Sequence, residues 1–298
     1  MKIKVSIITI NYNGLEDTCA LIETIPFNEN MEVIGVDNAS KNQEAETIAQ
    51  RYPQVLVIKS EQNLGFAGGN NLGIQAAQGR YIFLINNDTI FKEFNIQALI
   101  DRLESSQAIG IVCPKIRFAW DNNPIQFAGY SKLSRITVRN HAIGFNEEDH
   151  GQYDTAHPTP YAHGAAMLIR RDAVDKVDLM PECYFLYYEE IDWSMMFTRA
   201  GYQIWYEPKC TIFHKESQTT GQHSPLRTYY LTRNRLMLVQ RNPLEFYKTL
   251  AYIYLISIVA LRDIVKYTFS ARFDLQKGTL QGLWDFIFKR NKKLSTLN

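Results

Sequence analysis

The N-terminal part of the chain alternates between two patterns, and this alternation restricts the possible folds more than any other feature of the sequence. Apolar, β-branched runs occur in KVSIITINYN, MEVIGVDNAS, QVLVIKS and RYIFLINND. Helix-like stretches separate them at residues 15–25, 43–51 and 64–79. Strands that alternate with helices predict βαβ units. We therefore expect an α/β protein with a mostly parallel central sheet flanked by helices.

Three of these apolar runs end in polar side chains. The polar ends are Asn11-Tyr12-Asn13, Asp37-Asn38 and Asn86-Asn87-Asp88. Asn and Asp also form ordinary turns, so one such cluster would decide little. Ligands of open α/β sheets bind at the carboxyl ends of the strands, however. Three clusters at such ends predict a polar rim and a binding site along it.

The remainder of the chain predicts more strands and a helical end. Four further strands are expected at residues 109–118, 125–133, 161–171 and 203–214. A mobile polar loop is expected near the site at residues 140–160, because long loops in compact domains are usually functional or disordered. YYEEIDWSMMFTRAGY resembles a helix that ends at Gly201. From about Pro225 onward the pattern is helical.

Charge is distributed unevenly along the chain. The whole chain carries +1, which gives no general attraction to nucleic acid. From Arg241 to the end, ten Lys and Arg stand against four Asp and Glu, so this part carries +6 and residues 1–240 carry −5. A basic C-terminal part fits contact with anionic phospholipid, and it fits a solvated helix face equally well.

TLAYIYLISIVAL, residues 249–261, is the most apolar piece of the C-terminal part. It is shorter than the roughly 20 residues that span a bilayer. We expect it to pack against the rest of the protein, or to lie in a membrane interface beside Arg262, Lys266 and Arg272.

Cysteine usage and the N-terminus favour a reducing compartment. The four cysteines form no CxxC pair and lie among apolar residues, so buried free thiols are expected at Cys19, Cys113, Cys183 and Cys210. MKIKVSIITINYNG lacks the length and the cleavage site of a signal peptide. These features predict a cytoplasmic location.

Two phosphate-binding motifs are excluded. A dinucleotide-binding fingerprint requires GxGxxG directly after the first strand. The glycines Gly65, Gly68, Gly69 and Gly73 follow the third strand at another spacing. A GxxxxGK[ST] loop does not occur.

The polar residues at the strand ends fit the transfer of a sugar from a nucleotide diphosphate better than they fit these two phosphate-binding motifs. A divalent cation can neutralise the charge that develops on a diphosphate leaving group, and hard cations prefer oxygen ligands. Asp88 supplies a carboxylate at a strand end, and His214 supplies a nitrogen ligand at another. The acceptor hydroxyl needs a general base. Carboxylates for that role are available at a helix start, at Glu189, Glu190 and Asp192.

Several stretches resemble family 2 inverting glycosyltransferases with the GT-A fold. The resemblance is nearest to bacterial rhamnosyltransferase-like enzymes that build O-antigen, capsule and other cell-surface polysaccharides. The matching stretches are VSIITINYNG, VIGVDNAS, NLGFAGGNNLGIQAAQGRYIFLINNDT, HGAAMLIRRDAV, YFLYYEEIDWSMMFTRAGY and YYLTRNRLML. The resemblance implies a GT-A catalytic domain at residues 1–224, with a nucleotide-sugar-binding half at 1–108 and an acceptor-binding half at 109–224. Residues 225–298 would form a helical, membrane-associating region.

The resemblance also implies ligands and residue roles. The donor would be dTDP-rhamnose or a UDP-sugar, the cofactor Mg²⁺ or Mn²⁺, and the acceptor a glycan or lipid-linked glycan at the cytoplasmic face of the membrane. Donor contacts are implied for Asn11, Tyr12, Asn13, Asp37, Asn70, Asn71 and Asn87. The metal would be held by Asp88, Asn86 and His214, and Glu190 would be the catalytic base. Acceptor contacts are implied for His163, Gly164 and Trp193.

Three departures from the family pattern leave alternatives open. Asn86 replaces the usual first Asp of the metal motif and removes one charge. Glu190 replaces the commoner Asp, so Glu189 and Asp192 remain rival bases. VDLMPE replaces a glycine-containing turn before the acidic motif. A non-catalytic protein that binds sugar nucleotides or glycans, and a nucleotidyltransferase that releases pyrophosphate, are the competing hypotheses.

Overall fold

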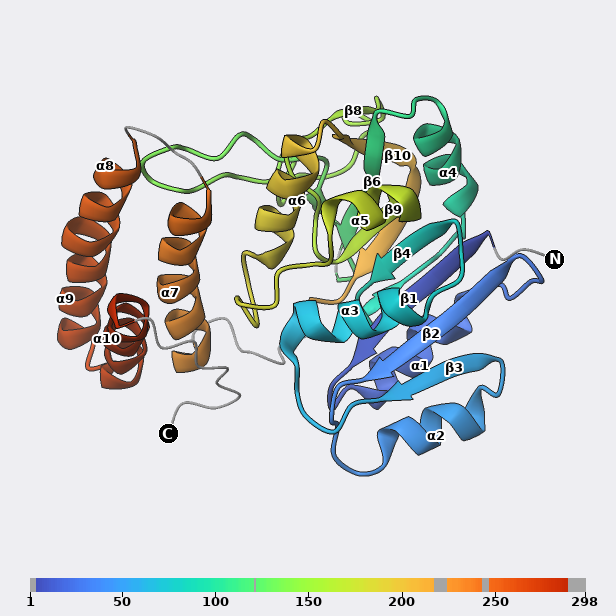
Figure 1. The fold of residues 1–298 in the computed structure, drawn as a ribbon, viewed down its shortest axis with the longest axis horizontal. Coiled ribbons are helices and arrows are strands. Elements are labelled where there is room, and N and C mark those ends of the chain that lie inside the picture. Colours follow the sequence, from blue (N-terminus) through green and yellow to red (C-terminus); the bar gives the residue numbers. More distant parts are fainter. Residues whose placement is uncertain (1–3, 121, 217–223, 243–246, 289–298) are drawn as a thin grey trace.

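A computed structural model describes residues 4–120, 122–216, 224–242 and 247–288 (Figure 1). Ten strands form one sheet within these residues. They are β1 (Val5–Asn11), β2 (Met31–Asp37), β3 (Val55–Lys59), β4 (Tyr81–Ile85), β5 (Thr89–Ile90), β6 (Ile109–Phe118), β7 (Ile125–Phe127), β8 (His157–Pro158), β9 (Ala166–Arg170) and β10 (Gln203–His214). The main strand order is β3-β2-β1-β4-β9-β6-β10-β5, with β7 beside β6 and β8 beside β10.

Strands β3, β2, β1 and β4 are parallel, as expected. The register pairs Asn11 with Asp37, so the polar ends of β1 and β2 lie side by side. The intervening helices are α1 (Leu15–Glu23), α2 (Glu44–Arg51) and α3 (Gly65–Ala76). Glycines let α3 approach β1 closely, since a Cβ at Gly73 would lie 2.3 Å from Ile8 Cγ2. This half of the fold follows from the periodicity of its sequence.

The second half of the sheet is mixed. β9 runs antiparallel between β4 and β6, and β10 is parallel to β6. β10 also pairs antiparallel with β5, which sets His214 opposite Thr89. The helices here are α4 (Ile96–Glu104), α5 (Arg171–Val177) and α6 (Glu189–Arg199). Helices α4 and α5 were not part of the sequence expectation, and the strand expected at 125–133 is the shorter β7.

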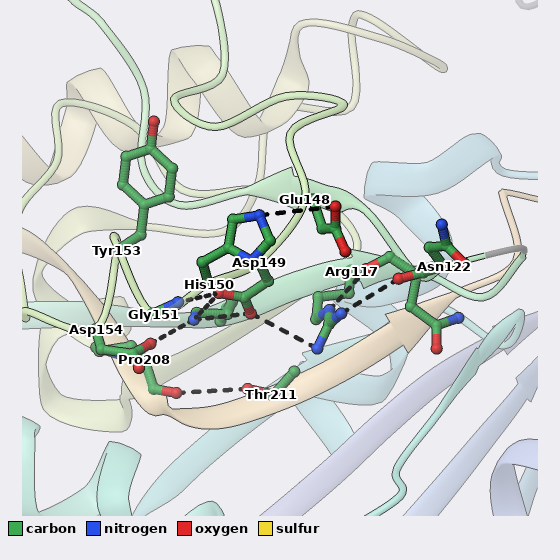
Figure 2. A network of polar contacts seen from close by, with 12 residues as sticks. Arg117, Asn122, Glu148, Asp149, His150, Gly151, Tyr153, Asp154, Pro208 and Thr211 are labelled. Carbon is green, nitrogen blue, oxygen red and sulfur yellow. Dashed lines mark hydrogen bonds and ion pairs between the residues drawn. The ribbon is translucent and has the colours of Figure 1, made fainter.

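The polar loop at residues 140–160 is fastened to the sheet. Lys115 of β6 is buried, and its Nζ donates hydrogen bonds to Asp149 and Asp154 (Figure 2). Arg117 Nη1 lies 3.6 Å from Asp149 Oδ2. Burial alone would raise the pKa of Asp149, but hydrogen bonds from Lys115 and Gly151 outweigh it and lower that pKa. Charged contacts therefore hold this loop to the sheet, which corrects the expectation that it is mobile.

The C-terminal helices stand together at the opposite end of the molecule from β2 and β3 (Figure 1). They are α7 (Pro225–Arg241), α8 (Tyr247–Ile253), the π-helix η2 (Tyr254–Ala260), α9 (Leu261–Phe269) and α10 (Phe273–Ile287). Ser224 Oγ caps α7 by accepting a hydrogen bond from Arg227 N. α10 lies close to α7, because a Cβ at Gly278 would be 2.6 Å from Pro225 O.

The apolar stretch 249–261 is divided between two environments. Leu255 and Val259 are buried in a cluster that includes Leu236 of α7. Ile253 and Ile258 are more than half exposed. One face therefore packs, as expected, and the other remains open. Within the residues that are described, no helix is both long and apolar enough to cross a membrane.

Candidate active site

Buried side chains join the ends of β1 and β2. Asn11 Nδ2 donates hydrogen bonds to Asp37 Oδ1 at 2.8 Å and to Glu44 Oε2 at 2.9 Å. Asn11 Oδ1 accepts a hydrogen bond from Thr18 Oγ1 at 2.8 Å. Because the Asn11 amide is enclosed and engaged by protein groups, the expectation that it lines the nucleotide base is corrected. Asp37 is also buried, but its carboxylate oxygens can accept further bonds, so its donor contact stays a prediction.

The other rim residues differ in accessibility. Tyr12 is half-buried and Asn13 is exposed. Asn13 has a φ of 54°, and its Oδ1 accepts a hydrogen bond from Lys41 N. Asn87 Nδ2 donates to Thr18 Oγ1 at 3.0 Å, so Asn87 belongs to the same network as Asn11. Tyr12 is thus the rim side chain best exposed for stacking on a base, and the donor roles of these residues stay predictions.

The two asparagines of α3 face protein groups. Asn71 Nδ2 donates to Met180 O at 2.9 Å and to Glu182 Oε1 at 3.1 Å, while Asn71 Oδ1 accepts from Met180 N at 3.1 Å. Asn70 Nδ2 donates to Phe66 O. Both residues are buried. The expectation that Asn71 holds the donor is therefore corrected: its amide fastens the segment that precedes α6 to α3. For Asn70 a donor contact stays a prediction.

The glycines of α3 let this helix pack closely against the segment that precedes α6. Phe66 N donates to Phe185 O at 2.8 Å. A Cβ at Gly65 would lie only 2.1 Å from that oxygen, and Gly65 has a φ of 74°. The glycine-rich sequence thus joins the two halves of the fold at the segment that leads into α6.

Asp88 and His214 form a pair at the ends of β4 and β10. His214 Nε2 lies 3.0 Å from Asp88 Oδ1, and His214 Nδ1 lies 2.8 Å from Gln126 Oε1. His214 thus faces the amide oxygen of Gln126 with one ring nitrogen and the Asp88 carboxylate with the other. Histidines that bind a metal commonly donate their second ring N–H to such an oxygen acceptor, so Gln126 could orient His214 toward a cation at Asp88. Gln126 could not be found from the sequence, because nothing local marks it.

The pair fits a divalent metal. Cis ligands of an octahedral ion with bonds of about 2.1 Å lie about 3 Å apart, which matches the Asp88–His214 separation. Asn86 follows β4, is half-exposed, and its side chain makes no hydrogen bond within the described residues. No group of three or more His, Cys, Asp or Glu suited to a metal occurs in the described part of the chain. Further ligands would therefore come from Asn86, diphosphate oxygens and water.

Glu189 and Glu190 begin α6 in different environments. Glu189 is 2% exposed, and its Oε2 has no hydrogen-bond partner among the residues described. Burial, and then repulsion from Glu190, raises the pKa of Glu189 well above its ordinary value. Glu190 is half-buried, and burial raises its pKa to about 7. Of the two, Glu190 is the more accessible, and its pKa suits a general base that works near pH 7.

The turn at residues 163–165 lies between Glu190 and the end of β4. Asn86 N donates to Ala165 O at 2.9 Å, and a Cβ at Gly164 would lie 3.8 Å from Glu190 Cγ. Ser194 Oγ accepts from Ala162 N and donates to Glu190 O, which ties α6 to this turn. The structure thus brings Glu190 and the Asp88–His214 pair to one place.

Aromatic rings surround this turn. The His163 ring is stacked on Tyr130 at 5.9 Å between centroids, and Phe127 lies 5.0 Å from it. Burial, and then His214, lowers the pKa of His163 to about 3, so its imidazole is neutral. His163 and Gly164 therefore lie beside the candidate base, and their acceptor roles stay predictions. Tyr130 was missed in the sequence because no pattern marks it.

Trp193 does not line the site. Its side chain is fully enclosed, its Nε1 donates to Asp178 O at 2.9 Å, and its ring packs on Phe197. The expectation that Trp193 faces an acceptor is therefore wrong. On α6 this residue points from the first turn into the core.

Asp192 is a structural carboxylate. It is fully buried, accepts a hydrogen bond from Tyr184 Oη, and is paired with Arg241 Nε at 2.5 Å. Asn242 Nδ2 donates to the other Asp192 oxygen at 2.9 Å. Asp192 therefore links α6 to the end of α7, and it is no longer a strong rival of Glu190.

Replacing Asp192 by Asn is expected to destabilise the protein by about 3 kcal/mol, because Arg241 and Tyr184 lose a buried charged partner. The free energy of unfolding from urea titration measures this. Asp274→Asn is the matched control, since Asp274 is an exposed carboxylate paired with Arg272, and little change is expected there. An Asp192 variant of wild-type stability that cannot transfer sugar would instead make Asp192 the base.

The segment before α6 has a backbone that most residues avoid. Phe185, Tyr187 and Tyr188 have φ angles of 67°, 69° and 77°. Two side chains of α7 hold it: Arg233 Nη2 donates to Tyr184 O at 2.8 Å, and Asn234 Nδ2 donates to Tyr187 O at 3.0 Å. Both are buried, and in the sequence they lie in an Arg-Asn-Arg run of a helix that carries other polar residues, so no local pattern distinguishes them. These residues position the start of α6 and hence Glu190.

Comparison with protein families matches residues 6–178 to the glycosyl transferase family 2 model. The match covers more than half of the chain, so this protein belongs to glycosyl transferase family 2. It is accordingly a glycosyltransferase, as the sequence resemblance implied.

Two relatives and one solved structure give further likeness. The chain is 24% identical to the low-salt glycan biosynthesis hexosyltransferase Agl10 of Haloferax volcanii, with 78% of this chain and 74% of the relative covered. It is 25% identical to the N-acetylglucosaminyl-diphospho-decaprenol L-rhamnosyltransferase of Mycobacterium tuberculosis, covering 64% and 68%. The mannosyltransferase PcManGT of Pyrobaculum calidifontis, solved with GDP-Man and Mn²⁺, superposes with a TM-score of 0.58 at 12% identity, covering 97% and 88%. The last likeness confirms the GT-A fold.

Proposed function

We propose that this protein is a metal-dependent, inverting glycosyltransferase that moves a sugar from a nucleotide-diphosphate sugar to a hydroxyl of a glycan or lipid-linked glycan. The observation that carries the proposal is the turn at residues 163–165. Its Ala165 is bonded to Asn86 beside the Asp88–His214 pair, and its Gly164 lies beside Glu190. A cation site for a diphosphate and a base for a hydroxyl thus meet at one turn.

Each group of residues has a chemical task in this proposal. Glu190, ionised above about pH 7, accepts the proton of the acceptor hydroxyl. Asp88, His214 and Asn86 hold Mg²⁺ or Mn²⁺, which when bound neutralises charge on the diphosphate leaving group. The hydroxyl attacks the anomeric carbon from the face opposite the diphosphate, which inverts that centre in one displacement. Burial of Glu189 disfavours a second negative charge beside Glu190, since it raises the pKa of Glu189.

The donor and acceptor are assigned to the two halves of the catalytic part. Residues 1–108 bind the donor through Tyr12, Asn13, Asp37, Asn70 and Asn87. Residues 109–224 bind the acceptor beside His163 and Gly164. The names of the two relatives support a hexose or rhamnose donor, with dTDP-rhamnose or a UDP-sugar favoured. The mycobacterial relative is named for a lipid-linked glycan, which supports such an acceptor here and a role in surface polysaccharide synthesis.

Membrane contact is part of the proposal. Many exposed apolar side chains lie on the C-terminal helices within residues 225–298, among them Ile258, Leu261, Val265 and Phe269. Contiguous apolar surface of this kind marks interaction sites, and basic residues flank it. We assign this region to peripheral contact with the inner leaflet of the plasma membrane.

A ligand screen tests the proposed function. The melting temperature of the full chain is measured with dTDP-rhamnose, UDP-sugars and GDP-mannose, each with Mn²⁺ and with EDTA. One donor is expected to raise it in Mn²⁺ only, since ligands that bind the native state stabilise it. The same mixture with an acceptor should then release a nucleoside diphosphate. Release of pyrophosphate would indicate a nucleotidyltransferase, and donor binding without any turnover would indicate a non-catalytic binding protein.

A further inference from the structure

A second cavity lies apart from the strand-end rim, where α7 meets η2 and α9. It encloses about 270 Å³. Arg139 and Arg235 line it together with the hydroxyl-bearing residues Tyr188, Thr228 and Tyr267. Figure 1 shows the loop that carries Arg139 running from the sheet toward the C-terminal helices. The loop is held there because Arg235 Nη2 donates to Thr137 O.

Arg235 is an unusual group to find in a cavity wall. The residue is 8% exposed, and its Nε has no hydrogen-bond partner in the part of the chain that is described. A buried N–H left without an acceptor is unfavourable, and more so on a charged group. Burial lowers the pKa of Arg235, and the neighbouring Arg139 and Arg262 lower it further. The cavity thus holds a charged donor that lacks an acceptor.

The charges around the cavity do not balance. Asp263 is the one carboxylate among the lining residues, and it is already paired with Arg262 through Nε and Nη2. Arg139 is exposed and forms no ion pair within the described residues. Two guanidinium groups therefore face the cavity without a countercharge. Guanidinium groups bind phosphate oxygens strongly, through paired charge-assisted hydrogen bonds.

The remaining walls of the cavity are mostly apolar. Leu255 and Val259 of η2 line it on one side, and Leu231 and Leu236 of α7 line it on another. Inorganic phosphate makes no favourable contact with such walls, whereas an anion attached to a hydrocarbon chain would place apolar atoms against them. Charge and apolar surface together fit a lipid phosphate.

We propose that this cavity binds the phosphate or diphosphate of a lipid-linked acceptor, with Arg139 and Arg235 holding its oxygens and the apolar side chains of α7 and η2 that line the cavity contacting its chain. The inference rests on the proposed function and adds the acceptor's anchoring site to it. Tyr188 lines the cavity and directly precedes α6, so an acceptor anchored there extends toward Glu190.

Binding of farnesyl diphosphate to the full chain in EDTA tests the proposal, because EDTA removes diphosphate binding that depends on a metal. Calorimetry is expected to show binding to the wild type, and Arg139→Gln and Arg235→Gln should each weaken it by about tenfold. Arg51→Gln is the matched control, since Arg51 is an exposed arginine on α2, paired with Glu23 at the far side of the fold. It should bind like the wild type. Because Arg139 is exposed, its variant tests the site even if Arg235→Gln folds poorly.

Three further arms separate the sources of phosphate. Inorganic pyrophosphate and farnesol should each bind more weakly than farnesyl diphosphate, and pyrophosphate binding as tightly would overturn the lipid assignment. Phosphatidylglycerol vesicles should bind the wild type and Arg139→Gln equally well. If Arg139→Gln lost vesicle binding to the same extent as farnesyl diphosphate binding, the cavity would be a site for membrane headgroups instead. Unchanged farnesyl diphosphate binding in Arg139→Gln and Arg235→Gln would overturn the inference. Metal-dependent turnover of the donor is measured separately and does not depend on that result. The proposed glycosyltransferase function and the proposed lipid-phosphate site can therefore be disproved independently.

Discussion

Replacing Glu190 by Gln is expected to lower the rate of sugar transfer by about 10²- to 10⁴-fold, the range over which general bases contribute. Gln keeps the shape of the side chain but cannot accept the proton of the acceptor hydroxyl. The fold should persist. The pKa of Glu190 is raised in the folded state, so the free energy of unfolding falls as the pH rises above the pKa that Glu190 has in the unfolded chain. The Gln side chain does not ionise and therefore removes this loss of stability. Transfer rates with saturating donor and circular dichroism measure the two effects.

Glu189→Gln is the control for this prediction. Glu189 is buried away from an acceptor, and burial raises its pKa, so an uncharged amide there should change transfer much less than the Glu190 substitution does. If Glu189→Gln were the more damaging change, Glu189 would take the role of base. Near-normal turnover of the Glu190 variant would remove Glu190 from that role.

Replacing Asp88 by Asn is expected to weaken Mn²⁺ binding by at least about 100-fold, because it removes the one carboxylate of the proposed metal site. Transfer should then require more Mn²⁺ than the wild type does. Mn²⁺ titrations of transfer, and of the melting temperature with donor present, give the two apparent affinities.

Asn86→Asp supplies the opposite change at the same turn. A second carboxylate should tighten Mn²⁺ binding, since affinity for hard cations rises with the number of charged ligands. Asn86 has the space for this, because its side chain is half-exposed and forms no hydrogen bond within the described residues. Equal Mn²⁺ dependence in wild type, Asp88→Asn and Asn86→Asp would place the metal elsewhere.

The N-terminal half of the fold could be predicted because its information is local. Each buried strand there has its own apolar run, and each polar strand end follows directly in sequence. The pairing of Asn11 with Asp37 follows from parallel neighbours alone. The same locality explains why Asp88 could be proposed from its neighbours in sequence. Glu190 was selected from Glu189, Glu190 and Asp192 by the family resemblance.

What could not be predicted depends on contacts between distant residues. Asn71 lies in a glycine-rich stretch typical of ligand binding, yet its amide is engaged by Met180 and Glu182, more than a hundred residues away. Trp193 follows the acidic start of α6, and only the packing of that helix shows that its ring is enclosed in the core. Arg233 and Asn234 hold the segment before α6 from another helix. No local pattern records such partners.

The pH dependence of kcat/KM for transfer tests the central claim most directly, since this constant reports the titration of the free enzyme. A base acts only when ionised, so kcat/KM of the wild type should rise with pH and level off above about 7, where Glu190 has lost its proton. The rising limb should be absent in Glu190→Gln, whose residual rate is flat over the same range. A limb that persists unchanged in Glu190→Gln, or a wild-type rate that falls as pH rises toward 7, would contradict the account.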